Sequence, residues 1–129
     1  DRLALPTWNL NLECLYDPAE FFLLTSDVNG TVPLSPELAS QCQRLLAARG
    51  REAPAKPIAF LTGGTDAGEL ARGGAQATTL IGMPWGNTNR SNVYHTPRDV
   101  LSAVSPEAVA AGMGLAIDLA GELDGRLGA

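Results

Sequence analysis

Apolar and polar residues alternate strictly near the start of the chain, over residues 7–15, which predicts a strand with one polar face. Its apolar side holds Trp8, Leu10, Leu12 and Cys14, and its polar side holds Asn9, Asn11 and Glu13. A second strand is predicted over residues 20–26, where aromatic and apolar residues follow one another. The short turn at 16–19 predicts that these two strands form an antiparallel hairpin. A further turn follows at Asn29-Gly30.

Helical spacing appears in three later segments. Ser35-Pro36-Glu37 combines an N-cap residue, a proline and an acid, and predicts a helix that ends at Gly50. A short helix is predicted over 66–72, and a second Ser-Pro-Glu signature predicts a long helix over 105–125. The recurring apolar positions are Leu38, Cys42, Leu45 and Leu46 in the first helix, and Val109, Met113, Ala116, Ile117 and Ala120 in the last.

Two short apolar runs, 58–61 and 77–81, lie between glycines and prolines and predict buried strands. A long loop is predicted over 82–93, after the second run. Strands separated by helices are typical of a sheet covered on both faces. The pattern therefore predicts an α/β fold, a three-layer α/β/α sandwich with a mixed sheet whose antiparallel part is the hairpin.

Composition narrows the class of protein. With 129 residues, 45% apolar and 18% charged, residues 1–129 are expected to form a single globular domain. A net charge of −5 without any basic run argues against nucleic acid and anionic membranes as partners. No apolar run is long enough to cross a membrane, and residues 1–4 do not resemble an export signal. Two cysteines without a Cys-x-x-Cys pair argue against a disulfide framework or a thiolate zinc site.

The single histidine, His95, lies in the most informative stretch, residues 94–99 (YHTPRD). Thr96 fits a helix N-cap, with a proline next and Asp99 at the position that closes a capping box. A histidine held beside such a cap has a fixed ring direction, which a metal ligand requires. A partly exposed loop histidine with one backbone hydrogen bond is the alternative.

Carboxylates supply the other candidates. Glu13 lies on the polar face of its strand near the strand's end, where α/β sheets gather ligands, and carboxylate and imidazole both bind zinc well. The alternative is an ordinary solvent-facing strand residue, which the alternating pattern does not exclude. Asp66 could be a first-turn helix acid or a carboxylate that supports a ligand. In the loop over 82–93, Trp85 and Asn87 are candidates for a substrate pocket, and a Trp packed beneath the loop is the alternative.

Together, Asn11-Leu12-Glu13, the stretch 60–66 (FLTGGTD) with 77–80 (ATTL), and Tyr94-His95-Thr96-Pro97-Arg98-Asp99 resemble the C-terminal portion of the zinc aminopeptidases of peptidase family M-twenty-eight. The resemblance covers nearly the whole chain. It implies a zinc-exopeptidase-like fold and a site of two zinc ions about one bridging aspartate. It implies that Glu13 and His95 are zinc ligands and that Tyr94 hydrogen-bonds the oxyanion. Asp66 matches a supporting aspartate, although Thr65 and Ala67 replace its usual neighbours.

The same resemblance implies that this chain holds only part of the site. The family's first histidine ligand, its bridging aspartate and its Glu-Glu pair come from an upstream segment without a counterpart here. We therefore expect a part of a metallopeptidase catalytic domain that acts on peptides with the upstream remainder of the same polypeptide. By itself the chain is expected to bind zinc weakly or not at all and to be inactive. The alternative is a non-catalytic module that keeps the fold for peptide binding or homo-oligomerisation.

Overall fold

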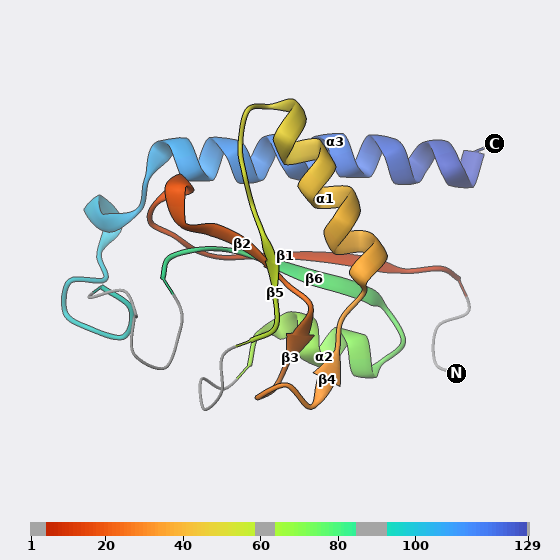
Figure 1. The fold of residues 1–129 in the computed structure, drawn as a ribbon, viewed down its shortest axis with the longest axis horizontal. Helices are drawn as coiled ribbons and strands as arrows, with labels where there is room; N and C mark the ends of the chain where they lie inside the picture. The colour runs from red at the N-terminus through yellow and green to blue at the C-terminus, as the bar shows by residue number, and fades with distance from the viewer. Residues whose placement is uncertain (1–4, 59–63, 85–92, 129) are drawn as a thin grey trace.

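The described part of the chain folds into a mixed sheet and three α-helices (Figure 1). The computed structural model describes residues 5–58, 64–84 and 93–128. Four strands form the main sheet, in the order β1 (Trp8–Leu15), β6 (Gln76–Gly82), β2 (Phe21–Leu24) and β5 (Ala55–Lys56). Two shorter strands, β3 (Ser26–Asp27) and β4 (Val32–Pro33), pair separately around the predicted turn. The mixed α/β class predicted from the sequence is confirmed.

The strand order corrects one prediction. β1 and β2 do not form a hairpin, because β6 lies between them, parallel to β1 and antiparallel to β2. β5 pairs parallel to the other edge of β2. A short 3-10 helix, η1 (Pro18–Glu20), occupies the predicted turn after β1 and turns the chain past the width of β6.

The helices begin where their caps predict. In α1 (Pro36–Ala48) the Ser35 hydroxyl accepts a hydrogen bond from the Leu38 amide at 3.1 Å. In α3 (Pro106–Gly128) the Ser105 hydroxyl accepts one from the Ala108 amide, also at 3.1 Å. The third helix, α2, covers Asp66–Arg72 as predicted. These side chains satisfy amide groups that the first turn of a helix leaves without a partner.

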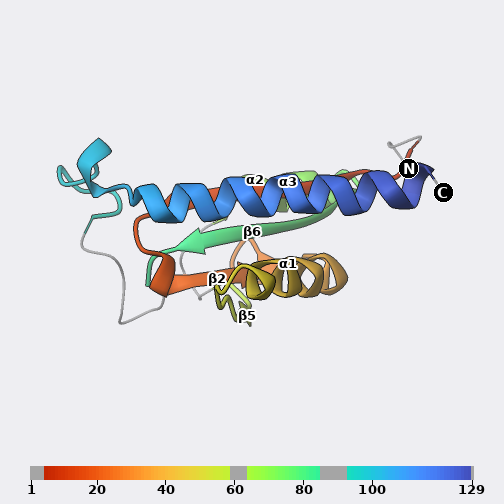
Figure 2. The same ribbon diagram turned by 90° about the horizontal axis from the view of Figure 1, so that it is seen from above.

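Two apolar clusters lie on opposite faces of the sheet. α1 and α3 cover one face and α2 lies against the other (Figure 1), and from above α3 runs along β1 (Figure 2). All four predicted α1 positions, Leu38, Cys42, Leu45 and Leu46, are buried in the first cluster. In the second cluster Phe22, Leu24 and Ile81 are buried against Ala67 of α2.

The buried face of α3 differs from the apolar stripe found in the sequence. Ala108, Leu115 and Leu119 pack into the core, whereas Met113 is 58% and Ile117 68% exposed. Apolar residues lie on two sides of this helix, so periodicity alone does not select the side that packs. Ion pairs of Arg49 with Asp118 and of Arg44 with Glu122, each at 2.7 Å, join α3 to α1 along a third side.

A β-bulge ends the alternation of β1. The register between β1 and β6 shifts between Glu13 and Leu15, and Cys14 adopts a positive φ of 54°. Leu15 therefore joins Leu10 and Leu12 on the α3 side, and Cys14 packs in the cluster on the α2 side. The prediction that Cys14 shares a face with Leu10 and Leu12 is wrong for this reason.

Ile58 is buried without being in a strand, and the rest of the strand predicted over 58–61 lies outside the described residues. Across the described ranges, no helix combines the length and the hydropathy that a membrane span requires.

Candidate functional site

The candidate residues lie at the carboxyl ends of β1 and β6, two neighbouring parallel strands. Glu13 is opposite Ile81 in the ladder, and each strand leaves the sheet within two residues of that pair. Carboxyl ends of adjacent parallel strands are the usual position of ligand sites in α/β sheets. The sheet thus presents Glu13 at the edge where such a site is expected.

A row of hydrogen bonds connects Glu13 to the interior. The Asn11 amide nitrogen lies 3.4 Å from Glu13 Oε1 and 3.4 Å from Thr79 Oγ1 on β6. The hydroxyls of Thr79 and Thr65 are 2.9 Å apart, and the Thr65 hydroxyl donates to the Asp27 carboxylate. Four segments distant in sequence are therefore linked by polar side chains on the α2 side of the sheet.

Asp27 is the fully buried end of this row. Its Oδ1 accepts hydrogen bonds from the amides of Val28 at 2.7 Å and Thr65 at 2.8 Å. A Cβ on Gly64 would lie 2.8 Å from Asp27 Oδ1, and one on Gly68 would lie 3.0 Å from its Cγ. The two glycines thus make room for the carboxylate, whose charge is compensated by hydrogen bonds.

Asp27, Thr65 and Thr79 were not predicted from the sequence as members of this network. Their only signal is the pair Gly64, just before α2, and Gly68, within it, which indicates a close neighbour at the start of this helix. Nothing in the local pattern identifies that neighbour. The contact joins residues 38 positions apart.

Glu13 is half-buried, and burial raises the pKa of its carboxyl group. The hydrogen bond from Asn11 lowers this pKa, while the negative charges of Asp66 and Asp27 raise it further. Asp66 occupies the first turn of α2, as one of its two sequence interpretations predicts. The arrangement concentrates negative charge near Glu13, which favours a proton or a cation there.

Tyr94 and His95 stack their rings, with centroids 3.8 Å apart and planes 20° from parallel. Tyr94 is partly buried and, like Cys14 and Tyr16, packs against the buried cluster on the α2 side of the sheet, whereas His95 is exposed with a φ of 57°. Stacking on a ring that is itself packed restricts the orientation of the imidazole. The orientation expected of His95 thus arises from a neighbouring aromatic ring.

The helix cap predicted at Thr96 is not formed. Residues 96–99 form turns, in which the Thr96 hydroxyl donates to the Val93 carbonyl at 2.6 Å and accepts from the Arg98 amide at 3.1 Å. The next helical turn, η2, covers Leu101–Ala103. A local side-chain turn therefore replaces the predicted capping box.

Asp99, the acid of that predicted box, instead accepts a hydrogen bond from the Tyr16 hydroxyl at 2.8 Å. This bond ties the segment of Tyr94 and His95 to the chain just after β1. Burial and the bond to Asp99 raise the pKa of Tyr16, which stays protonated as the donor. Residues 11–16 and 94–99 are therefore held at one end of the sheet.

The thiols of Cys14 and Cys42 are not suited to act as nucleophiles or metal ligands. Burial, with the charges of Glu13 and Asp99, raises the pKa of Cys14 to about 11, and burial raises that of Cys42 to about 12. Both are free cysteines. At neutral pH each remains a neutral thiol, which is a poor nucleophile and metal ligand.

The described residues do not complete a metal site. Among them, no three His, Cys, Asp or Glu side chains are arranged so that they could hold a metal ion. Trp85 and Asn87, the predicted pocket residues, lie outside the described residues.

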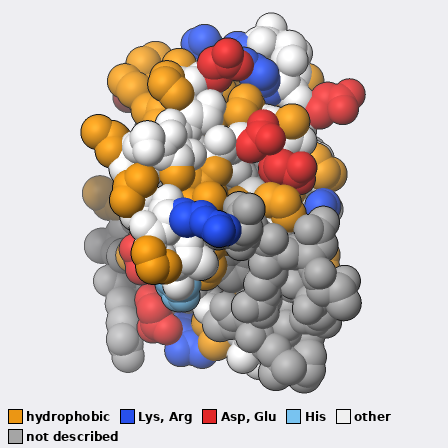
Figure 3. Space-filling view, turned by 90° about the vertical axis from the view of Figure 1, so that its left-hand side faces the viewer, with side chains coloured by type: hydrophobic (Ala, Val, Ile, Leu, Met, Phe, Trp, Pro, Cys, Tyr) orange, Lys and Arg blue, Asp and Glu red, His pale blue; other side chains and the backbone are white. Residues whose placement is uncertain are grey.

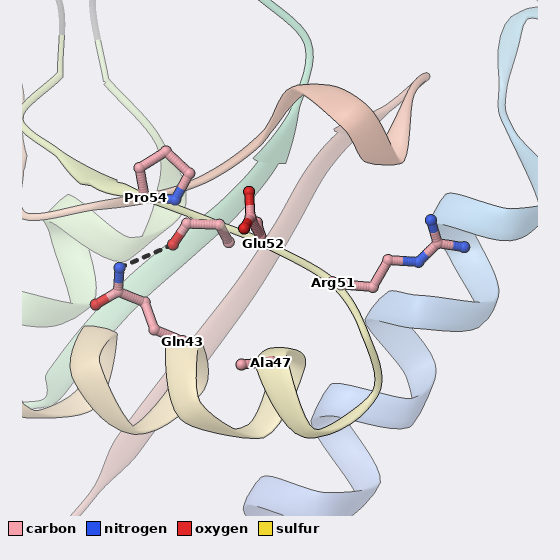
Figure 4. Close-up of a pocket in the computed structure, with 6 residues that line it drawn as sticks. Gln43, Ala47, Arg51, Glu52 and Pro54 are labelled. Carbon is pink, nitrogen blue, oxygen red and sulfur yellow. Dashed lines mark hydrogen bonds between the residues drawn. The ribbon is translucent and has the colours of Figure 1, made fainter.

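An open pocket of about 400 Å³ lies elsewhere, between α1 and the segment before β5 (Figure 4). There the Gln43 side-chain amide donates to the Ala53 carbonyl at 2.9 Å, and Arg51 forms an ion pair with Glu107 at 3.5 Å. These contacts hold the segment after α1 in place. None of the predicted site residues lines this pocket.

Comparison of the chain with protein-family models, with curated proteins and with solved structures gives no match.

Proposed function

We propose that this chain is part of a zinc-dependent peptidase of the aminopeptidase type and supplies Glu13 and His95 as two of its zinc ligands. The observation that carries the proposal is the hydrogen bond of Tyr16 to Asp99, together with the packing of Tyr94 and Tyr16 against the same buried cluster. These contacts join the two segments on which the family resemblance chiefly rests. The same proposal includes the specific fold that the resemblance implies, a three-layer sandwich of the zinc-exopeptidase type.

The chain's own residues fit half of such a site. A catalytic zinc has about three protein ligands and an open position, and this chain offers two ligands. In the proposal, the other ligands and the general base come from an upstream part of the same polypeptide. A zinc ion bound there would polarise the scissile carbonyl and lower the pKa of a bound water.

In the proposed partial site, each candidate residue has a different role. The exposed imidazole of His95 is held by the Tyr94 ring, and Glu13 offers a carboxylate whose raised pKa reflects burial beside other acids. Tyr94 would donate a hydrogen bond to the oxyanion of a peptide substrate. Asp66 and Asp27 would favour a cation at Glu13 through their charges.

A calorimetric zinc titration of this chain tests the ligand assignment. We expect weak binding, which His95→Ala and Glu13→Gln each reduce and Glu20→Gln, an exposed acid of η1, leaves unchanged. Equal binding by all four proteins would contradict the assignment. Tight stoichiometric binding by the chain alone would contradict the half-site proposal.

One observation favours the alternative function, an interaction module that is not catalytic. Exposed apolar residues gather where α3 begins, with Leu101 at 88% and Met113 at 58% exposure. Large exposed apolar patches usually mark an interaction surface. This alternative predicts that neither Glu13 nor His95 affects any activity of the polypeptide.

A further inference from the structure

The row of hydrogen bonds between Glu13 and Asp27 has a direction, which the chemistry of its members determines. The fully buried Asp27 accepts at every bond: its Oδ1 accepts from the amides of Val28 and Thr65, and its Oδ2 accepts from the Thr65 hydroxyl. A hydroxyl group has one proton to donate. Because Thr65 donates its proton to Asp27, its oxygen can only accept at the 2.9 Å contact with Thr79.

The same reasoning determines the next two contacts of the row. Thr79 donates its proton to Thr65, so the Thr79 oxygen accepts from the Asn11 side chain, 3.4 Å away. Asn11 must therefore present its amino group, and not its carbonyl oxygen, to Thr79. The same amino group lies 3.4 Å from Glu13 Oε1, so its second proton is directed to that carboxylate. The orientation of the Asn11 amide is thus set from the buried end of the row.

Two local features show that the fold maintains Asp27 at the expense of favourable local structure. Val28 has a φ of 50°, a conformation that is unfavourable for a β-branched residue, and from it the Val28 amide donates to Asp27 Oδ1 at 2.7 Å. Thr65 is the N-cap residue of α2, yet its side chain forms no capping bond to this helix. Its hydroxyl bonds Asp27 and Thr79 instead. A strained residue and a missing cap beside one carboxylate indicate that Asp27 has a role beyond packing.

We propose that Asp27 is a positioning residue, which acts through this row to hold the Asn11 amino group against Glu13 Oε1. One oxygen of Glu13 is thereby fixed by a donor, and the other remains to bind a cation. That this cation is zinc rests on the proposed function, whereas the orientation of the Asn11 amide does not. The row ends at the end of the molecule that faces the viewer in Figure 3, where the histidine side chain (pale blue) reaches the surface.

The substitution Asp27→Asn tests this role, because it keeps the shape of the side chain and reverses the row. Two backbone amides donate to the Oδ1 position, so the carbonyl oxygen of the new side chain must stay there. Its amino group then takes the Oδ2 position and donates to the Thr65 hydroxyl. Both hydroxyls of the row then donate in the opposite direction, and Asn11 turns its carbonyl oxygen toward Thr79. Glu13 Oε1 faces an oxygen in place of a donor.

Nuclear magnetic resonance of the chain without metal measures the orientation of the Asn11 amide. In the wild type we expect nuclear Overhauser effects between the side-chain amide protons of Asn11 and the β proton of Thr79. In Asp27→Asn we expect these effects to be lost, while the backbone signals of β1 and β6 keep their positions. A loss of stability alone does not turn a side-chain amide, so this signature separates a positioning role from a purely structural one.

Substitutions at Thr79 test the row a second time, and they decide the matter if Asp27→Asn does not fold. Thr79→Val keeps the shape of the side chain and removes the hydroxyl, so the Asn11 amide should lose its fixed orientation. Thr79→Ser keeps the hydroxyl and should behave like the wild type. Thr78→Val is the matched control, because Thr78 is equally buried but donates to the Leu24 carbonyl at 2.9 Å, outside the row. It should leave the Asn11 signals unchanged.

Calorimetric titration with zinc chloride measures the consequence at Glu13. Asp27→Asn and Thr79→Val should each raise the dissociation constant about tenfold, as the loss of a partner behind a metal ligand does, and Thr79→Ser and Thr78→Val should not. Unchanged Asn11 signals in Asp27→Asn would overturn the positioning role. So would zinc binding by Asp27→Asn that equals the wild type while Glu13→Gln binds more weakly. A turned Asn11 amide with equal zinc binding by every protein, Glu13→Gln included, would support the positioning role and contradict the proposed function.

Discussion

The Tyr16 hydroxyl lies 2.8 Å from Asp99 Oδ1, although 83 residues separate the two in sequence. Tyr16 follows β1 directly, and Asp99 ends the segment of residues 93–99, which carries His95. This hydrogen bond, with the packing of Tyr94 in the same cluster, determines that both candidate ligands belong to one end of the sheet.

Removing this bond should loosen the segment without unfolding the domain. Tyr16→Phe keeps the ring and deletes the donor, so we expect a loss of about 1 kcal/mol in the free energy of unfolding. Asp99→Asn, which keeps an acceptor oxygen, should lose less. Urea melts measure both, and hydrogen exchange of residues 93–99 should rise in Tyr16→Phe. An unchanged exchange rate would show that the bond does not hold the segment.

A methyl group introduced beside Asp27 should lower the stability of the fold. A Cβ at Gly64 would lie 2.8 Å from Asp27 Oδ1, so we expect Gly64→Ala to destabilise the fold by about 1–3 kcal/mol. Gly121→Ala is the matched control, because nothing lies within 4 Å of its Cβ position in α3. That control should stabilise the protein by about 0.5–1 kcal/mol. Thermal melts of the two variants should therefore shift in opposite directions.

Glu13 should make stability depend on pH. Its folded pKa is raised by burial, so in the window above the ordinary value of about 4.3 the folded chain binds more protons than the unfolded chain. The contribution of Glu13 to stability therefore falls as the pH rises through this window. Glu13→Gln lacks this titration and should gain stability relative to the wild type between about pH 4 and about pH 7.

Paired urea melts at the two pH values measure that difference. Glu20→Gln is the control, since Glu20 is exposed and its substitution should follow the wild-type pH dependence. A Glu13→Gln protein that keeps the full wild-type dependence would show that another group is responsible.

Shortening a buried side chain of α1 tests how much this helix contributes to the stability of the core. Leu45 is 8% exposed in the cluster between α1, α3 and the sheet, so Leu45→Ala should lose about 2–5 kcal/mol. Leu70, 45% exposed on α2, is the comparison and should lose far less. A loss below about 1 kcal/mol for Leu45→Ala in a urea melt would mean that this face contributes little to the core.

The sequence was sufficient for elements whose signals are local. Ser35 and Ser105 cap their helices as predicted, and the alternation of residues 7–15 gives β1. Strand pairing was not predictable in this way, because it depends on where distant residues meet. β6 inserts between β1 and β2, and the bulge at Cys14 reverses a face that alternation had assigned.

The candidate site was only partly predictable, because residue types are visible in the sequence but long-range contacts are not. Glu13 and His95 stand out by residue type and position, but the contacts that join their segments are long-range. Thr96 and Asp99 fit a capping box by spacing, yet the structure uses Thr96 in a local turn and Asp99 as a partner of Tyr16. Asp27 carries no local signal, since its amide donor from Thr65 lies 38 residues away.

The most direct test of the account is aminopeptidase activity of a longer polypeptide that contains this chain and the upstream part that the proposed function requires. With zinc supplied, we expect aminoacyl-nitroanilide hydrolysis. His95→Ala should lose one zinc equivalent and most turnover, and Tyr94→Phe should keep its zinc and lose turnover by about 10²–10³. Glu20→Gln should match the wild type. Full activity and full zinc content in His95→Ala would contradict the account.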